Sequence, residues 1–210
     1  MKIIAHRGMW LKPEEKNTIS AFERALQNGF GIETDFRDFN GELVISHDPA
    51  GPGSIKAQSF FDLCSHYPGV DPHAINIKSD GLQKLLNPYL AKWSIQDYFV
   101  FDMSVPDSLG YIKSKINTFT RVSEYEDYQD FDNHATGIWL DAFKSEWYSE
   151  QVIRDFSLLG KRIAIVSPEL HGREHRALWG MLKSLCALDI NMMLCTDLPL
   201  EAKRYFYDQN

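Results

Sequence analysis

The feature that most constrains the fold is the regular alternation of short apolar runs with segments of helical periodicity. The apolar runs are rich in Val and Ile, which predicts buried strands. They lie at 2–5, 31–34, 74–78, 98–101, 118–122, 137–140, 162–166 and 191–195. Between most of these runs, apolar residues recur at three- and four-residue spacing, as on one face of a helix. Such alternation favours a parallel sheet covered by helices.

About eight strand–helix units in succession predict an α/β protein of the (β/α)8 TIM-barrel class. We expect residues 1–210 to form one compact domain, near the low end of the usual length for this fold. An open, doubly wound sheet is the competing architecture. No glycine-rich phosphate loop follows the first strand, which disfavours a dinucleotide-binding sheet.

Composition and charge exclude several classes of function. The formal net charge is −7, so the chain lacks the basic surface that nucleic-acid binding requires. Hydrophobic residues make up 44% and charged residues 24%, as in a soluble globular domain. No stretch approaches a membrane span, and the apolar run at the start is too short for a signal peptide, which predicts a cytoplasmic location. Cys64, Cys186 and Cys195 are widely separated, which predicts reduced, mostly buried thiols.

Two carboxylates two residues apart carry the strongest chemical signal. Glu33 and Asp35 lie on a predicted strand, where residues two apart point to the same face. Oxygen ligands that converge in this way suit a hard cation such as Mg²⁺ or Ca²⁺. Because such pairs are also common on solvated strands, the case depends on other residues. His6 and Arg7 end the first predicted strand, and His47 follows the apolar run after the carboxylates.

The dipeptide Asn40-Gly41 is a strong signal for a two-residue hairpin turn. A strict hairpin of this kind pairs Thr34 with His47. That register places His47 on the face opposite Glu33, because a strand alternates its faces residue by residue. For His47 to reach the carboxylates, the second strand of the hairpin needs a bulge or a bend, which we predict.

Five motifs follow one another along the chain in a specific order. They are HRG at 6–8, NT with AFERAL at 17–26, GIETDFR at 31–37, NGELVISHD at 40–48 and TDLP at 196–199. Each is weak alone, but in this order they resemble the glycerophosphodiester phosphodiesterase family. The resemblance is dense over the first four of these motifs, thin in the middle of the chain, and returns at TDLP, residues 196–199. It implies a TIM barrel with a metal-dependent phosphodiesterase site.

The resemblance implies a role for each matching residue. These roles are acid–base catalysis for His6 and His47, metal binding for Glu33, Asp35 and Asn76, and phosphate binding for Arg7 and Lys78. Asn76 stands where the family usually has a further glutamate ligand, so we expect weaker metal binding, because an amide oxygen brings no charge. Asn76 and Lys78 also match the third-strand pattern of the similar, distant sphingomyelinase D enzymes of spider venom.

The chain also departs from the family pattern in ways that leave the substrate open. Lys16 stands where the family has a glutamate. The turn between Asp35 and His47 is shorter than usual. The longer insertion that shapes the glycerol pocket in many members is missing.

Further polar residues follow other predicted strands. After the strand at 162–166, Glu169 and His171 occupy a position that favours a phosphate or substrate contact, although a plain loop is an equal alternative. Asp102 and Asp141 also follow strands, and each is predicted to be a solvated or capping carboxylate. The remaining histidines lie in polar surroundings and are predicted to be surface residues: His66, His73, His134 and His175.

Together these features predict a divalent-metal phosphodiesterase that acts on a small phosphodiester, with glycerophosphodiesters as the first expectation. A bound cation and cationic side chains would neutralise the anionic substrate. One histidine would deprotonate the attacking hydroxyl or water, and the other would protonate the leaving alkoxide. Two alternatives stay open: a lyase or transferase that forms a cyclic phosphate, and a barrel that has lost turnover and only binds. The sequence does not determine the oligomeric state.

Overall fold

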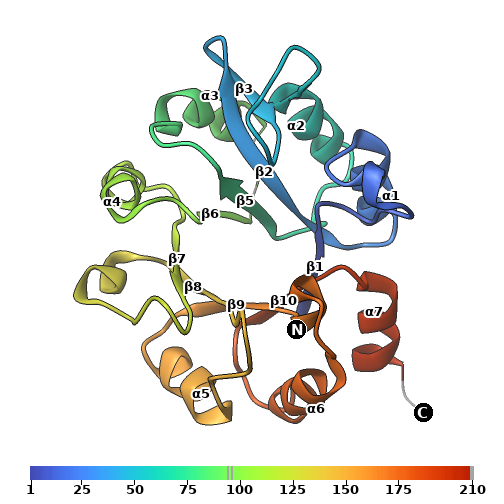
Figure 1. The fold of residues 1–210 in the computed structure, drawn as a ribbon, viewed down its shortest axis with the longest axis vertical. Helices are drawn as coiled ribbons and strands as arrows, with labels where there is room; N and C mark the ends of the chain where they lie inside the picture. The colour runs from blue at the N-terminus through green and yellow to red at the C-terminus, as the bar shows by residue number, and fades with distance from the viewer. Residues whose placement is uncertain (94, 96, 209–210) are drawn as a thin grey trace. The chain divides into compact units, whose positions relative to one another are not determined.

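The computed structural model describes residues 1–93, 95 and 97–208 of the chain. Its contacts divide the chain into two compact units (Figure 1). The N-terminal unit is Ile4–Thr118, and the C-terminal unit is Met1–Ile3 together with Phe119–Asn210. The single domain over residues 1–210 stays a prediction, and residues 94, 96, 209 and 210 lie outside the described part.

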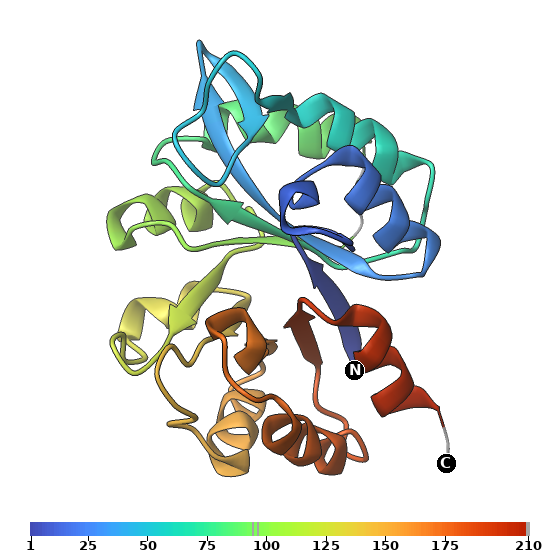
Figure 2. The ribbon, with the colours of Figure 1, turned by 45° about the vertical axis from the view of Figure 1, so that its right-hand side comes forward.

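The sheet of the N-terminal unit is built around one long strand. Its strands are β1 (Lys2–His6), β2 (Gly31–Phe39), β3 (Glu42–Ile45), β4 (Ile55–Lys56), β5 (His73–Ile77) and β6 (Tyr98–Phe101). The first half of β2 pairs in parallel with β1 and β5, and β5 pairs in parallel with β6. The second half of β2 continues as an antiparallel hairpin with β3 (Figure 2). At Gly31 a side chain would collide with the carbonyl of Pro72, so glycine is needed where β2 passes the start of β5.

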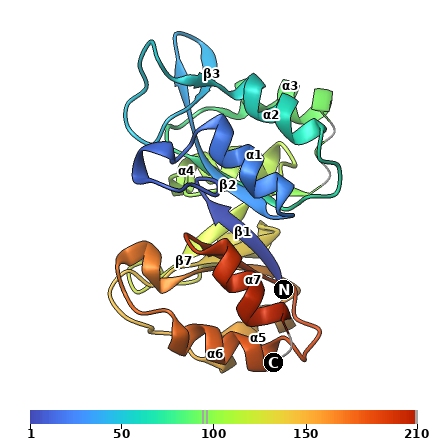
Figure 3. The ribbon, with the colours of Figure 1, turned by 90° about the vertical axis from the view of Figure 1, so that its right-hand side faces the viewer.

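Helices cover the outer face of this sheet. The helical segments are η1 (Pro13–Glu15), α1 (Ile19–Gln27), α2 (Ala57–Ser65), α3 (Gln83–Trp93) and α4 (Val105–Lys113). Helices α1, α2 and α3 lie side by side (Figures 1 and 3). The Thr18 hydroxyl caps α1 by accepting a hydrogen bond from Ala21 N at 3.3 Å. Phe22 of α1 and Phe36 of β2 both pack edge-to-face on Phe60 of α2, with ring centroids 5.4 and 5.8 Å apart, so aromatic contacts join helices and sheet.

The C-terminal unit repeats the same alternation. Its strands are β7 (Phe119–Val122), β8 (Gly137–Leu140), β9 (Arg162–Val166) and β10 (Met192–Thr196), and its helical segments are η2 (Asp130–His134), α5 (Glu150–Leu158), η3 (Pro168–His171), α6 (Arg176–Leu185) and α7 (Pro199–Tyr207). Neighbouring strands pair in parallel in the order β10, β9, β8, β7. A side chain at Gly137 would collide with the Phe119 ring and the Arg162 carbonyl, which explains the glycine at the start of β8.

In sequence order, the parallel strands β1, β2, β5, β6 and β7 to β10 alternate with helical segments, as the sequence predicts. Strand β2 runs five residues beyond the predicted end at residue 34, because it forms the hairpin with β3. Val100 of β6 forms an isolated parallel bridge with Thr118, and its backbone N–H donates to the Asn117 carbonyl at 2.8 Å. None of the helices described here is long and apolar enough to cross a membrane.

His73 differs from the prediction of a surface histidine. It begins β5, which is buried along its whole length, and its side chain packs on Phe60 with ring centroids 5.6 Å apart. Only 3% of the residue is exposed. Burial lowers the pKa of His73 from 6.5 to about 4, opposed by the charges of Asp71 and Asp97. The expected mostly buried thiols are confirmed, since Cys64 and Cys195 are buried while Cys186 is exposed.

Candidate active site

The carboxyl ends of β1 and β5, together with the parallel first half of β2, bring four of the predicted residues to one face of the sheet in the N-terminal unit. Strand pairing sets His6 beside Glu33, and it sets Asp35 beside Asn76. Paired residues of parallel strands share a face, as do residues two apart on one strand. The contacts agree with this register, because Asn76 Nδ2 donates to Glu33 Oε1 at 3.2 Å. His6 Nε2 lies 3.9 Å from Glu33 Oε2.

Asp35 is fully buried and lies between two cationic side chains. Arg7 Nε lies 3.1 Å from Asp35 Oδ2, and Lys78 Nζ lies 3.7 Å from Asp35 Oδ1. The backbone N–H of Arg7 also donates to Glu33 Oε2 at 3.2 Å. A buried carboxylate is tolerated when such charges and hydrogen bonds surround it, so Arg7 and Lys78 explain how Asp35 can lie in the interior.

Glu33 is a perturbed acid. Burial, and next the negative charge of Asp35, raise the pKa of Glu33 from 4.5 to about 7. The charges of His6 and Arg7 and the hydrogen bond from Asn76 oppose this rise. A carboxyl group whose pKa is raised by burial and by a neighbouring carboxylate is an arrangement that additional positive charge would stabilise.

Two buried oxygens that accept no hydrogen bond within the described residues show whether the site suits a divalent cation. Asp35 Oδ1 and Asn76 Oδ1 are buried and accept no hydrogen bond within the described residues. They belong to paired neighbours on β2 and β5. Oxygen atoms of carboxylates and amides are the ligands that Mg²⁺ and Ca²⁺ prefer, so the donor set fits a hard cation. In the described part of the chain no group of three His, Cys, Asp or Glu side chains is arranged around a metal position, and here the third oxygen donor is the amide of Asn76.

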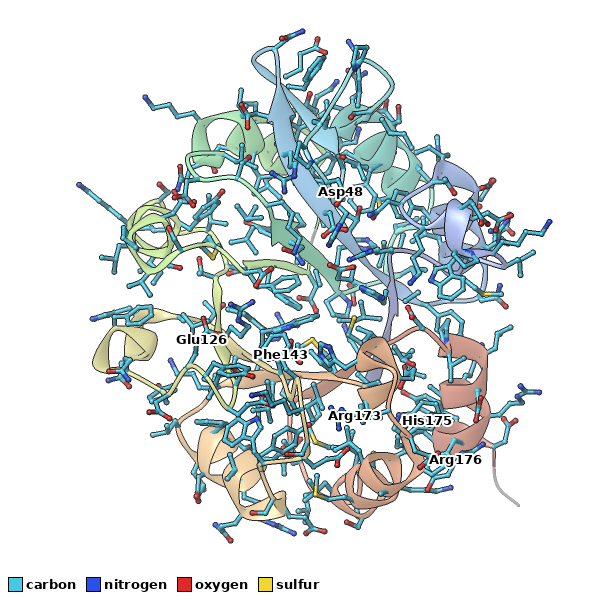
Figure 4. The ribbon with its side chains drawn as sticks, viewed as in Figure 1. Asp48, Glu126, Phe143, Arg173, His175 and Arg176 are labelled. Carbon is cyan, nitrogen blue, oxygen red and sulfur yellow. The ribbon has the colours of Figure 1, made fainter. Side chains whose placement is uncertain are left out.

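His47 does not join this cluster through any hydrogen bond or ion pair of the described residues. The ladder between β2 and β3 is regular from Phe36 opposite Ile45 to its turn, so it contains no bulge, and the other form of the prediction, a bend, is found just after the strand. Strand β3 instead ends at Ile45, and the chain bends at residues 47–49. His47 Nδ1 lies 2.9 Å from Asp48 Oδ1, in the loop where Figure 4 labels Asp48. The His47 side chain is 47% exposed, because it has left the ladder and lies beyond the strand.

Glu169 and His171 lie in the C-terminal unit, within η3. The Glu169 carboxylate accepts hydrogen bonds from the hydroxyl groups of Ser167 and Thr196 and ties the end of β9 to the end of β10. His171 Nε2 lies 2.8 Å from Asp141 Oδ1, a carboxylate just after β8. Glu169 and His171 therefore both have hydrogen-bond or ion-pair partners inside the C-terminal unit. Their contact with a phosphate or substrate stays a prediction.

Sequence reasoning missed two residues of the cluster. Asn17 Nδ2 donates to Asp35 Oδ2 at 2.7 Å, and Asn17 Oδ1 accepts from Thr34 Oγ1 at 2.9 Å. Asp102 Oδ2 lies 2.8 Å from Lys78 Nζ. Both residues have positive φ, 60° for Asn17 and 72° for Asp102. The position of Asp102 directly after a strand was the available signal, but capping explains such a residue equally well.

Comparison with known proteins adds information about the fold. No protein-family model and no curated protein matches the chain by sequence. A glycerophosphodiester phosphodiesterase from Parabacteroides distasonis matches with a TM-score of 0.73 at 15% identity, covering 98% of this chain and 96% of that one. A phosphodiesterase from Oleispira antarctica, solved in complex with the product sn-glycerol-3-phosphate, matches with a TM-score of 0.73 at 14% identity and the same coverage.

A third similar structure is a Ca²⁺-dependent phosphatidylinositol-specific phospholipase C from Streptomyces antibioticus. Its TM-score is 0.58 at 9% identity, covering 96% of this chain and 95% of that one. At such identities a likeness shows the fold, and the reaction has to be argued from the site. The prediction of a (β/α)8 TIM-barrel fold is confirmed: the chain has the fold of the glycerophosphodiester phosphodiesterases.

Proposed function

We propose that the chain is a phosphodiesterase that requires a divalent cation, Mg²⁺ or Ca²⁺, and cleaves a small glycerophosphodiester-like substrate. The observation that carries this proposal is the cluster of two carboxylates, an amide, His6 and two cationic side chains where the carboxyl ends of β1 and β5 flank β2. Enzymes of this fold place their chemistry at that end of the strands. The Oleispira antarctica structure, whose product is sn-glycerol-3-phosphate, supports the substrate class.

Glu33, Asp35 and Asn76 would hold the cation through their side-chain oxygens. When bound, a divalent cation neutralises the nonbridging oxygens of a phosphodiester. Arg7 and Lys78 stand beside Asp35 and contribute fixed positive charge, which stabilises the phosphate most where negative charge builds up in the transition state. The predicted phosphate-binding role of these two residues is therefore consistent with their position.

The two histidines divide the proton transfers. One accepts a proton from the attacking water as the new P–O bond forms, and the other gives a proton to the alcohol oxygen as its P–O bond breaks. His6 borders Glu33. His47 is half-exposed, and its bond to Asp48 through Nδ1 leaves Nε2 available to a substrate.

The remaining parts of the proposal concern the whole chain. We propose that residues 1–210 act as one domain and that Glu169 and His171 add substrate contacts. The net charge of −7 supports a small-molecule substrate and no nucleic acid as a partner. A cytoplasmic location is part of the same proposal.

Alcohol release from glycerophosphocholine, glycerophosphoethanolamine and bis(p-nitrophenyl) phosphate tests the function. Reactions contain Mg²⁺, Ca²⁺ or EDTA, and the variant His6→Ala is compared with His66→Ala, which removes an exposed histidine of the same unit. We expect turnover that EDTA and His6→Ala abolish and that His66→Ala leaves intact. Turnover unaffected by EDTA would contradict the cation requirement. No turnover on any ester, by a folded protein, would favour the barrel that only binds.

Phosphorus NMR of the products separates hydrolysis from the cyclic alternative. Attack by water gives a phosphate monoester, whereas attack by a neighbouring hydroxyl of the substrate gives a cyclic phosphate. A glycerol phosphate monoester as the first product supports hydrolysis. A cyclic product that forms first would identify a lyase.

A further inference from the structure

Lys78 stands between two carboxylates at unequal distances. Its Nζ lies 2.8 Å from Asp102 Oδ2 and 3.7 Å from Asp35 Oδ1. Asp35 is the more deeply buried of the two, with a side chain that is 0% exposed against 15% for Asp102. Asp35 Oδ1 nevertheless accepts no hydrogen bond within the described residues. A buried carboxylate oxygen with an ammonium group so close normally forms a direct bond, so the preference of Lys78 for Asp102 needs a cause.

The backbone at Asp102 supplies that cause. Strand pairing sets Phe101 of β6 beside Asn76 of β5, so Asp102 begins the loop next to the end of β5, where Lys78 follows. Asp102 has φ of 72°, in the left-handed region that asparagine and aspartate tolerate better than most residues with a side chain. Conformations of this kind gather at functional sites, where the surrounding structure maintains them.

We propose that Asp102 is a positioning residue that holds the Lys78 ammonium away from Asp35 and so keeps Asp35 Oδ1 open for a divalent cation. This inference rests on the proposed function and explains how the cation position survives beside a lysine. Arg7 already lies at Oδ2, so Oδ1 is the oxygen of Asp35 that remains. Because Asn76 contributes no charge, only two carboxylates attract the cation. Competition between the Lys78 ammonium and the cation for Asp35 Oδ1 therefore matters more than it would in a site with three carboxylates.

Without the Asp102 carboxylate, Asp35 is the nearest acid to Lys78. The ammonium would then move onto Asp35 Oδ1, because an unpaired buried charge costs free energy. A divalent cation would have to displace it. Asp102 would therefore act on cation binding only through Lys78, which distinguishes this role from a direct contribution of its own negative charge.

A double-mutant cycle measures this coupling. Binding of Mg²⁺ and Ca²⁺, without substrate, is measured by titration calorimetry for wild type, Asp102→Asn, Lys78→Met and the double variant. Asparagine keeps the size and tolerates the positive φ, so the fold is preserved, which circular dichroism and thermal melting check. Asp80→Asn is the control, since it removes an exposed carboxylate two residues from Lys78 that binds the Ser104 hydroxyl.

We expect Asp102→Asn to weaken cation binding about tenfold in the wild-type background and by less than about twofold when Lys78 is methionine. The control variant should stay within about twofold of wild type. An equal loss of cation affinity in both backgrounds would show that Asp102 acts on the cation directly, and no loss in either would show that it does not act on cation binding. Each of these results would overturn the inference about Asp102 and leave the proposed function standing. Absence of any cation binding by the wild-type protein would overturn the proposed function together with this inference.

Discussion

Asn17 and Asp35, from the loop after β1 and from β2, are joined by a 2.7 Å hydrogen bond in which Asn17 Nδ2 donates to Asp35 Oδ2. The same asparagine accepts from the Thr34 hydroxyl, and its backbone N–H donates to the Arg7 carbonyl at 3.0 Å. One side chain thus connects the loop that carries Arg7 to the strand that carries the buried carboxylate.

Replacing Asn17 should destabilise the protein, because the buried Asp35 carboxylate would lose a hydrogen-bond donor. We expect Asn17→Ala to lower the free energy of unfolding by about 2–3 kcal/mol, because Asp35 loses a donor and alanine disfavours the positive φ. Asn40→Ala is the matched control, since Asn40 has φ of 51° in an exposed turn and shows the backbone cost alone. Urea unfolding compares the two. Equal losses would mean that the bond to Asp35 adds nothing.

A third acid at the cluster should strengthen cation binding. Asn76→Asp adds a negative charge beside Asp35, so we expect about tenfold tighter binding of Mg²⁺ or Ca²⁺ by calorimetry. The same change should lower the melting temperature in EDTA, because Glu33 loses the hydrogen bond from Asn76 Nδ2 and three carboxylates repel one another. Unchanged affinity would place the cation elsewhere.

His73 should make stability depend on pH. Its pKa is about 4 in the folded protein against 6.5 in the unfolded chain, so the unfolded chain binds the proton first as the pH falls. Stability is therefore complete above pH 6.5 and is lost between pH 6.5 and 4, by about 2 kcal/mol from pH 7 to 5. Urea midpoints at both pH values test this, with His73→Gln and the exposed His66→Gln as a pair. The loss should shrink in His73→Gln only.

His47 and Asp48 should contribute unequally to turnover. Removal of a proton-transfer group costs about 10²-fold or more in kcat, which we expect for His47→Ala. Asp48→Asn keeps a hydrogen-bond acceptor near Nδ1 and should cost about threefold to tenfold. The His47 side chain is about half exposed and that of Asp48 is largely exposed, so melting temperatures should change little. Full activity of His47→Ala would leave His6 without its proposed partner.

The strands illustrate what local pattern predicts well. The boundaries at 98–101, 137–140 and 162–166 agree with β6, β8 and β9, because buried strands need continuous apolar runs and those runs are visible in the sequence. The shared face of Glu33 and Asp35 follows from the two-residue repeat of a strand in the same way. The polar motifs that follow the strands also predicted which residues are candidates for the active site.

His73 shows where local pattern fails. Its polar neighbours in the sequence predict exposure, yet it begins a strand that is buried along its length and packs against α2. His47 shows a second limit, because the hairpin register and the need for a bulge or a bend were predicted correctly, but not that β3 ends at Ile45 with the bend after it. Burial and strand ends depend on which elements pack together, and sequence neighbours carry little of that information.

By itself, then, the sequence determined the alternation of strands and helices and the residue types that can bind a cation and a phosphate, since both depend on side-chain spacing along a few residues. Only the tertiary structure decided that Asn76 hydrogen-bonds Glu33 and that Lys78 binds Asp102 more closely than Asp35. Those contacts join residues far apart in the chain. They depend on strand pairing and on left-handed backbone positions, which the packing of the whole unit stabilises.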